Sequence, residues 1–382
     1  MNKRLKVAML GGVTLLCLSP LMTPGITTTM SVATKRYSIK HTLVTGSSSK
    51  HVSARRTIKA VSTIARMNPD QVYTYAAMQC DILRLAHTYP HLIHYEILGQ
   101  TLYGRNIYAV SLGTGPATAF INGSHHAREW MTTTLNMYMI DQYARAYMTR
   151  KTIAGYDVRN LLSRTTLWFI PMVNPDGVTL VQFGDTAFPK RIRPSLVRMN
   201  HGSNNFSDWK ANAQGIDLNR QYDGGWNQMW YDIVSHPWYE DYKGPKPYDT
   251  RETQAVLRLI RQVNPQIEAA YHSSGQVIYW GYKISSKNFS LDKRLAQGLA
   301  NLTGYALVMP GPDPSGGGLT DWWTHNMLRP GFTIEIAPYV GPRPVPLSDF
   351  PDVWNKNKAV GLYLAAYADR SFASHKTIRN VP

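Results

Sequence analysis

Apolar residues recur with two spacings along this chain, and the change from one to the other predicts strands followed by helices. Alternating or continuous apolar runs bounded by turn residues predict strands at residues 92–98, 107–112, 117–121, 165–172, 267–271, 277–280 and 332–336. Helical spacing predicts helices at residues 70–87, 129–148, 251–263, 291–302 and 353–367. Strands and helices that alternate in this way favour an α/β domain, in which helices cover both faces of a mixed sheet.

Turn residues organise the segments between these elements. Tyr103-Gly104-Arg105 separates the first two predicted strands and indicates a hairpin. Asn174-Pro175-Asp176-Gly177 follows the strand at 165–172 and predicts a structural turn. Residues 178–250 show no regular period and are rich in glycine and aromatic residues. Long irregular segments inside a compact domain usually build binding surfaces.

The first 33 residues have the composition of a signal peptide. A basic start at residues 1–6 precedes an apolar run from Val7 to Met22, and Ser31-Val32-Ala33 provides a small-x-small cleavage site. The apolar run is interrupted by Pro20 and is short for a membrane span. We therefore expect a secreted protein with no transmembrane helix in the mature chain. An N-terminal anchor that is not cleaved is the alternative.

Charge is distributed unevenly along the 382 residues, which carry a net charge of +17. Residues 34–69 contain eight basic residues and no acidic one, so we interpret them as a basic linker or short pro-segment. Such an arm is typical of proteins that bind polyanions, including the anionic polymers of a cell wall; a solvated tail without a partner is the alternative. Residues 70–370 form the expected folded domain, and residues 371–382 form a C-terminal tail.

The most informative motif is Ile121-Asn122-Gly123-Ser124-His125-His126-Ala127-Arg128-Glu129-Trp130, at the junction of a predicted strand and helix. His126 and Glu129 are three residues apart, so both side chains can face one point as the helix begins. An imidazole and a carboxylate suit zinc, which takes about four N, O or S ligands. Taken alone, a histidine and a glutamate at this spacing more often form a surface ion pair.

Two residues at or near strand ends extend this motif. His272 follows the predicted strand 267–271, and α/β sheets place functional groups at such strand ends, although a buried structural histidine is the alternative. Glu335 lies within the apolar run 332–336, where a carboxylate is costly without a partner. A zinc site with an open position for water needs a general base for amide cleavage, and Glu335 is the expected base.

Together these segments resemble the zinc carboxypeptidase family, the carboxypeptidase A-like metallopeptidases. The resemblance covers roughly residues 70–370 and rests on five motifs in the family's order. They are His-Ala-Arg-Glu-Trp at 126–130, Asn-Pro-Asp-Gly at 174–177, Asp-Leu-Asn-Arg at 217–220, His-Ser-Ser at 272–274 and Phe-Thr-Ile-Glu at 332–335. The resemblance implies a single domain built on a mostly parallel, twisted sheet of about eight strands.

The resemblance also implies a role for each matching residue. One zinc ion is expected on His126, Glu129 and His272, with Glu335 as the base that moves the proton to the leaving amine. Arg128 is expected to stabilise the oxyanion. Asn219 and Arg220 are expected to bind a free carboxylate of the substrate, and Asp217 to orient His126.

The chain departs from the family at two places. Lys210 stands where the family often has an arginine aimed at the scissile carbonyl, and lysine lacks the fork-shaped guanidinium. Pro310-Gly311-Pro312-Asp313-Pro314 precedes Ser315, so the tyrosine that closes over the substrate in digestive carboxypeptidases is absent. We expect Lys210 to bind substrate, and the missing tyrosine makes ordinary trimming of protein C-termini less expected.

Three segments resemble a bacterial branch of the family more closely: Trp209-Lys210-Ala211-Asn212, His272-Ser273-Ser274-Gly275 and Ser315-Gly316-Gly317-Gly318. Peptidases of that branch cut the γ-D-glutamyl–diaminopimelate bond of peptidoglycan stem peptides. The resemblance thus implies a bacterial enzyme, secreted or associated with the cell wall. A secreted carboxypeptidase for ordinary peptides and a non-catalytic wall-binding module are the alternatives. No nucleic-acid partner is expected, because no recognised motif accompanies the basic arm.

Overall fold

The computed structural model describes residues 65–229, 233–311 and 316–379. The predicted signal peptide, and the basic arm up to residue 64, lie outside these residues. No helix among the described residues is long and apolar enough to cross a membrane.

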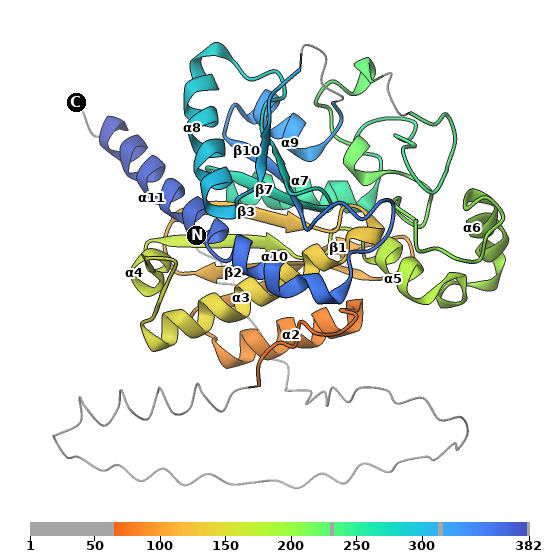
Figure 1. Ribbon diagram of the computed structural model, residues 1–382, viewed down its shortest axis with the longest axis horizontal. Coiled ribbons are helices and arrows are strands. Elements are labelled where there is room, and N and C mark those ends of the chain that lie inside the picture. Colours follow the sequence, from red (N-terminus) through yellow and green to blue (C-terminus); the bar gives the residue numbers. More distant parts are fainter. Residues whose placement is uncertain (1–64, 230–232, 312–315, 380–382) are drawn as a thin grey trace, which may run out of the picture. The chain divides into compact units, whose positions relative to one another are not determined.

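A mixed sheet of eight strands runs through the described domain (Figure 1), which confirms the predicted α/β fold. Its strands stand in the order β1-β2-β6-β3-β7-β10-β8-β9. They are β1 (Ile93–Gln100), β2 (Asn106–Gly113), β3 (Ala117–Gly123), β6 (Thr165–Ile170), β7 (Glu268–Ser273), β8 (Val277–Tyr279), β9 (Ala306–Val308) and β10 (Gly331–Ile336). The four central strands β6, β3, β7 and β10 are parallel to one another, and β1 and β2 form the predicted antiparallel hairpin. A separate two-stranded ribbon joins β4 (Thr152–Ile153) and β5 (Tyr156–Asp157).

Ten α-helices lie in the described ranges. They are α2 (Tyr75–Thr88), α3 (Met131–Thr149), α4 (Val158–Leu162), α5 (Pro175–Phe183), α6 (Arg193–Met199), α7 (Arg251–Val263), α8 (Ser286–Thr303), α9 (Leu319–Trp322), α10 (Phe350–Asn357) and α11 (Val360–Arg379). Short turns of 3-10 helix precede α3, at Ala127–Glu129, and follow Asp217, at Leu218–Arg220.

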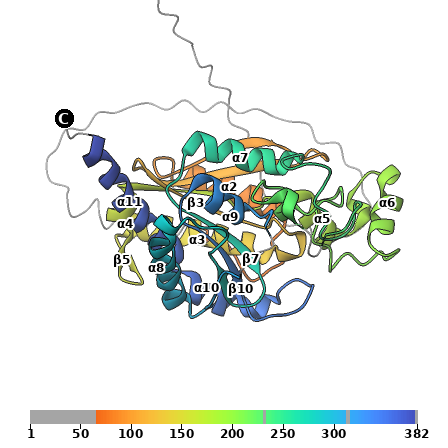
Figure 2. The same ribbon diagram turned by 90° about the horizontal axis from the view of Figure 1, so that it is seen from above.

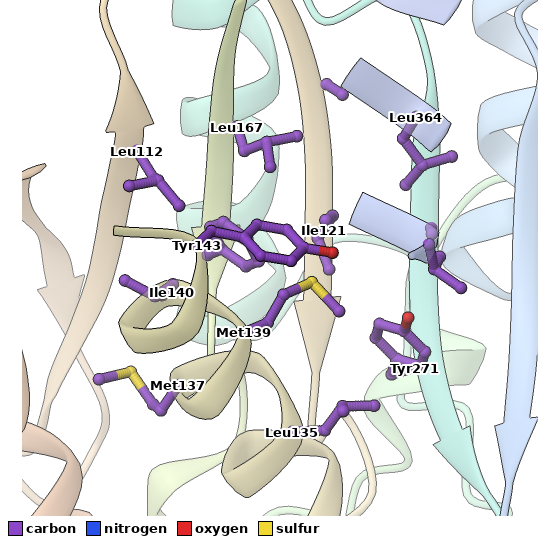
Figure 3. Packing of buried hydrophobic residues seen from close by; sticks show 14 of the residues in the cluster. Leu112, Ile121, Leu135, Met137, Met139, Ile140, Tyr143, Leu167, Tyr271 and Leu364 are labelled. Carbon is purple, nitrogen blue, oxygen red and sulfur yellow. The ribbon is translucent and has the colours of Figure 1, made fainter. Parts of the chain in front are cut away.

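Side-chain alternation along the strands produces a separate apolar core on each face of the sheet. In β3, Ala119 and Ile121 belong to the core beneath α3 and α11, whereas Phe120 belongs to the core beneath α7 and α9. Figure 3 shows the first core, where Tyr143 of α3 and Leu364 of α11 pack over the strands. In the view from above, α7 and α3 lie on opposite sides of the strands (Figure 2). The central strands are thus covered on both faces, as parallel strands require.

Several predicted boundaries are wrong for physical reasons. Helix α2 begins at Tyr75, not near residue 70, because Thr74 caps it and accepts a hydrogen bond from Ala77 N. Before the cap the chain has no regular secondary structure, yet Met67 and Tyr73 are almost fully buried. The expected final helix at 353–367 is two helices, α10 and α11.

The predicted turn at residues 174–177 is instead the start of helix α5. Asn174 is its N-cap and accepts a hydrogen bond from Gly177 N at 2.9 Å, and Pro175 takes the first helical position, where its missing N–H costs nothing. Asn174 also donates to the backbone carbonyls of His125 and Ala211, each at 3.1 Å. The motif therefore ties together two segments that contribute to the site described below. The predicted irregular segment 178–250 contains most of α5 and all of α6.

Candidate active site

Three neighbouring parallel strands end at one edge of the sheet, and the candidate site lies there. His126 follows the end of β3 by three residues, His272 is the penultimate residue of β7, and Glu335 is the penultimate residue of β10. The parallel register of β7 and β10 places Glu335 opposite His272. The carboxyl ends of strands are where open α/β sheets bind ligands. Residues more than 200 positions apart in the chain thus become neighbours.

A turn with left-handed backbone leads from β3 to His126. Ser124 has a φ of 52° and is fully buried. Its N–H donates to Thr132 Oγ1 at 2.8 Å, and its hydroxyl lies 2.7 Å from that of Thr133. A non-glycine residue in this conformation costs on the order of 1–3 kcal/mol and persists only where its surroundings hold it. Helix α3 therefore stabilises the turn that presents His126.

His126, Glu129 and His272 converge on a single point. The Nδ1 atoms of the two histidines lie 3.1 Å apart. Glu129 Oε1 lies 2.7 Å from His126 Nδ1, and Glu129 Oε2 lies 2.9 Å from His272 Nδ1. One ligand atom from each residue lies within 4.8 Å of the others, and all three residues are buried. Two imidazoles and one carboxylate are a ligand set of catalytic zinc sites, which leave a further position for water. The donor set therefore fits the metal that the sequence predicts.

Burial and neighbouring charges both shift the pKa values of the three groups in this cluster. Burial by itself would raise the pKa of Glu129, but His126 and His272 hold that pKa well below its usual range. Burial lowers the pKa of His272, which favours the neutral ring that ligates a metal. Burial opposes protonation of His126, yet Glu129 and Asp217 raise its pKa. Binding of a metal to His126 is therefore expected to release a proton.

A series of acidic and basic side chains extends from His126 to Arg220. Asp217 Oδ1 lies 3.2 Å from His126 Nε2, and Asp217 Oδ2 lies 3.1 Å from Lys210 Nζ. Lys210 Nζ also lies 2.6 Å from Asp241 Oδ1, and Arg220 Nη2 lies 3.9 Å from the same oxygen. A carboxylate beside the second nitrogen of a ligating histidine fixes its tautomer and orientation. Asp217 is therefore positioned to fix the tautomer and orientation of His126.

Lys210 stands between two carboxylates and is not a free cation. Burial opposes its charge, but Asp217 and Asp241 raise the pKa of Lys210. In turn, Lys210 and His126 hold the pKa of Asp217 well below its usual range, against the effect of burial. Lys210 lines the cavity, as predicted for a substrate-binding residue, yet its ammonium is already engaged. Its direct contribution in this structure is to neutralise Asp217 and Asp241.

Glu335 lines the cavity beside the cluster and forms no ion pair with any residue that the structure describes. Burial raises its pKa to about 8, and the neighbouring negative charge of Glu129 adds to the effect. A cation held by the cluster would lower that pKa again. Glu335 is therefore poised to accept and return a proton near neutral pH, which is what a general base requires.

The cavity at this edge has a volume of about 540 Å³. Seven of the nine predicted site residues line this cavity, namely His126, Arg128, Glu129, Lys210, Asn219, Arg220 and Glu335. His272 lies in the ligand cluster with His126 and Glu129. Asp217 lies fully buried behind Lys210. The structure thus brings all the predicted residues to one region.

Arginine and asparagine side chains shape the remaining wall. Arg128 Nη1 donates to the carbonyl of Asp208 at 2.7 Å and to Glu240 Oε2 at 3.2 Å. Asn219 Oδ1 accepts from Leu319 N at 3.1 Å, and Arg220 Nη1 donates to the Asn219 carbonyl at 3.2 Å. These contacts hold the cationic groups against the wall while leaving them at the cavity surface.

Residues that the sequence did not single out also belong to this region. Asp241 joins Lys210 to Arg220, and Asp321, Thr320 and Tyr339 line the cavity. The one available signal for Asp241 was the acidic pair Glu240-Asp241 within a segment otherwise rich in aromatic and glycine residues. Nothing local distinguishes Thr320 or Tyr339, because their place depends on how distant loops pack.

The fold and sequence are similar to those of known peptidases. The family model for zinc carboxypeptidases matches residues 78–357. A gamma-D-glutamyl-L-diamino acid endopeptidase 1 from Lysinibacillus sphaericus is 34% identical over 299 residues, which are 78% of this chain and 73% of that protein. Carboxypeptidase B from Rattus norvegicus is 27% identical over 271 residues, covering 67% of this chain and 60% of that protein. The crystal structure of thrombin activatable fibrinolysis inhibitor matches with a TM-score of 0.64 and 18% identity, over 84% of this chain and 81% of that chain, and so shares its fold.

Proposed function

The chain belongs to the zinc carboxypeptidase family and is a zinc metallopeptidase, and from this premise we propose that it cuts the γ-D-glutamyl–diaminopimelate bond of peptidoglycan stem peptides. The observation that carries the chemistry is the convergence of His126, Glu129 and His272 within 4.8 Å, beside Glu335. The bond specificity is supported by the 34% identical relative, whose name describes a γ-D-glutamyl-L-diamino acid endopeptidase.

In this proposal His126, Glu129 and His272 would hold one zinc ion, which would supply a Lewis acid for the scissile carbonyl and lower the pKa of a water molecule. Glu335 takes a proton from the attacking water and returns it to the departing amine. Asp217 keeps His126 in the ligating tautomer, because its Oδ1 lies 3.2 Å from Nε2. Arg128 places positive charge at the cavity wall next to the cluster, where an oxyanion develops.

Asn219 and Arg220 are proposed to hold the substrate. Asn219 and Arg220 line the cavity, and the guanidinium of Arg220 has the planar fork that pairs with a carboxylate. In a tripeptide stem, diaminopimelate carries a free carboxylate next to the scissile amide, so Arg220 binds that group. Asp241 Oδ1 lies 3.9 Å from Arg220 Nη2. This arrangement supports cleavage close to a free carboxylate.

The location of the protein is part of the same proposal. A leader at residues 1–33, a basic linker or pro-segment at 34–69 and a catalytic domain from residue 70 support a secreted or wall-associated bacterial enzyme. The basic arm is proposed to bind the anionic polymers of the wall. Removal of the leader is tested by determining the N-terminal sequence of the protein recovered from the culture medium.

The test of the substrate is a comparison of two peptides. The zinc-loaded chain is incubated with L-alanyl-γ-D-glutamyl-diaminopimelate and with a peptide of ordinary α-linked L-residues, and the products are measured by mass spectrometry. Release of diaminopimelate from the first peptide alone is the expected result, with Glu335→Gln as the inactive control. Equal cleavage of the first peptide by this variant would contradict the assigned base.

A second candidate function is removal of C-terminal residues from ordinary peptides. It is favoured by the 27% identity to carboxypeptidase B from Rattus norvegicus. Release of the terminal residue from the α-linked peptide, with no cleavage of the γ-linked one, would select this function. The segment in which the digestive enzymes carry their closing tyrosine lies partly outside the described residues, at 312–315.

A further inference from the structure

A basic segment projects beside the active site and is used by none of the chemistry above. Helix α6 lies at the edge of the domain next to α5 in both views (Figures 1 and 2). Residues 184–205, which include α6, contain four basic residues and one acidic residue. The basic residues are Lys190, Arg191, Arg193 and Arg198. Three of them, all except the partly buried Arg193, are exposed.

This charge is not neutralised by neighbouring side chains. Among the described residues, no carboxylate forms an ion pair with Arg191 or Arg198. Arg198 donates a hydrogen bond to Ser195 Oγ at 3.1 Å, and Arg193 donates to the carbonyls of Thr186 and Phe188. An unpaired cluster of guanidinium groups attracts anions, most strongly at low ionic strength.

The arginines border a surface hollow that also contains aromatic rings. This hollow, with a volume of about 630 Å³, lies between α6 and residues 236–238 and is lined by Arg191, Arg198, Ser195, Gln214, His236 and Trp238. The ring of Trp238 is partly exposed, and its centroid lies 5.3 Å from that of His236 and 4.7 Å from that of His201. A second hollow of about 620 Å³ along the same helix is lined by Lys190, Arg193, Arg198 and one acidic residue, Asp185. The two hollows share Arg198, and together they suit an extended ligand rather than a single small molecule.

The position of this surface relative to the active site is set by the backbone. Beneath it Phe188 and Leu196 are buried in a small apolar core that also contains Ala127 of the catalytic motif. Tyr239 N donates to the carbonyl of Met199, at the end of α6, and the Tyr239 carbonyl accepts from Lys210 N at 2.9 Å. A ligand on the hollow is therefore held at a fixed distance from the cavity that contains Lys210.

We propose that the surface formed by α6 and residues 236–238 binds the acidic glycopeptide polymer to which the substrate peptide is attached. Trp238 offers a partly exposed aromatic ring to the apolar side of a sugar, Gln214 and Ser195 offer hydrogen bonds, and Arg191 and Arg198 attract carboxylates on the polymer. This inference rests on the proposed function, because the polymer follows from the stem-peptide substrate. Binding there raises the local concentration of stem peptides at the active site.

The test compares an insoluble polymer with a soluble fragment. Arg191→Glu/Arg198→Glu is measured against the wild-type chain for binding to peptidoglycan sacculi stripped of phosphate-containing polymers, and for hydrolysis of the soluble γ-linked tripeptide. We expect roughly tenfold weaker binding to sacculi, with a matching loss of product from them, whereas kcat/KM for the tripeptide stays within about twofold. Trp238→Ala tests the aromatic part and is expected to weaken binding at high salt as well, because its contribution is not electrostatic.

The matched control places the same charge change on another helix. Lys293 and Arg294 are exposed on α8, and Lys293→Glu/Arg294→Glu is expected to bind sacculi as the wild-type chain does, if total charge is not the cause. Thermal unfolding of each variant establishes that it is folded. Equal binding by the α6 and α8 variants, or capture only by sacculi that retain phosphate polymers, overturns the proposal. Binding to sacculi is also measured with Glu335→Gln, which cannot degrade them. Failure of the wild-type chain to cleave the tripeptide rejects the proposed function, whereas the binding measurement decides whether the α6 surface binds the polymer.

Discussion

Strand β7 begins with a buried acid and ends beside another, and the two acids have opposite protonation. Glu268, at its first position, is fully buried and accepts from Asn122 Nδ2 at 2.9 Å and from Thr320 Oγ1 at 3.3 Å. Both partners are neutral, and burial raises the pKa of Glu268 to about 8. At the other end of the strand, Glu129 contacts His272 and His126, and they hold its pKa well below its usual range.

The contrast shows that the charge of the partners, more than burial, decides the state of an interior carboxyl group. Hydrogen bonds from an amide and a hydroxyl satisfy Glu268 without compensating a negative charge, so this end of the strand suits a structural, protonated acid. Two imidazoles compensate the charge on Glu129, so this end suits a cation. Glu335 lies at the charged end, but burial and, to a smaller extent, the like charge of Glu129 raise its pKa to about 8.

Removing one histidine at the charged end has the largest expected effect. His272→Ala leaves two ligands, which is too few for a zinc site, so we expect loss of bound metal and a fall in kcat/KM of more than roughly 10³-fold. Zinc is measured per chain by mass spectrometry and activity with the γ-linked tripeptide. Glu268→Gln is the control from the other end of β7 and is expected to keep its metal. Normal zinc content in His272→Ala would remove the distinction between the two ends.

Replacing the base separates metal binding from catalysis. Glu335→Gln preserves the shape of the side chain but cannot take up a proton, so we expect kcat to fall by roughly 10²–10⁴-fold. Zinc content is expected to stay at the wild-type value, since Glu335 is not in the ligand cluster. Loss of zinc together with activity would show instead that Glu335 supports the metal directly.

Removing the negative charge beside His126 is expected to lower zinc affinity without abolishing zinc binding. Asp217→Asn removes the charge beside His126 Nε2 while retaining most of the shape, and we expect zinc affinity to fall by about 10–100-fold. The affinity is measured by competition with a chelator of known strength. Lys210→Met, which removes the cation that neutralises Asp217, is a second variant of the same charge chain. Unchanged affinity in both variants would show that the ligand cluster needs no support from this wall.

Glu268→Gln is expected to leave activity nearly unchanged and to alter only how stability depends on pH. The pKa of Glu268 is raised from 4.5 to about 8 on folding, so the folded chain retains a proton that the unfolded chain releases. Its stabilising contribution is complete below pH 4.5 and is lost as pH rises to about 8, at a rate of about 1.4 kcal/mol per pH unit. Urea unfolding of the zinc-loaded proteins at pH 5 and pH 8 measures this loss, and the glutamine variant is expected to lose less. The same pH dependence in both proteins would show that Glu268 is ionised in the folded chain.

Patterns within single elements were predictable from the sequence, because they depend on contacts between near neighbours. The helix at residues 251–263 and the hairpin of β1 and β2 follow from apolar spacing and a glycine turn. The spacing of His126 and Glu129 likewise predicts that they share one face, and in the structure His126 Nδ1 lies 2.7 Å from Glu129 Oε1. Asn174-Pro175 was misread as a turn, because the same residues that form turns also cap helices.

Distances across the sheet were decided by the tertiary structure alone. Resemblance to a family named His272 and Glu335, but their contact depends on the parallel register of β7 and β10, which packing of the helices on both faces selects. Asp241 and the hollow beside α6 had no counterpart in any local pattern, since each is formed by segments that meet only after folding. Sequence spacing specifies which face of an element a residue occupies, whereas the packing of distant elements decides what that face meets.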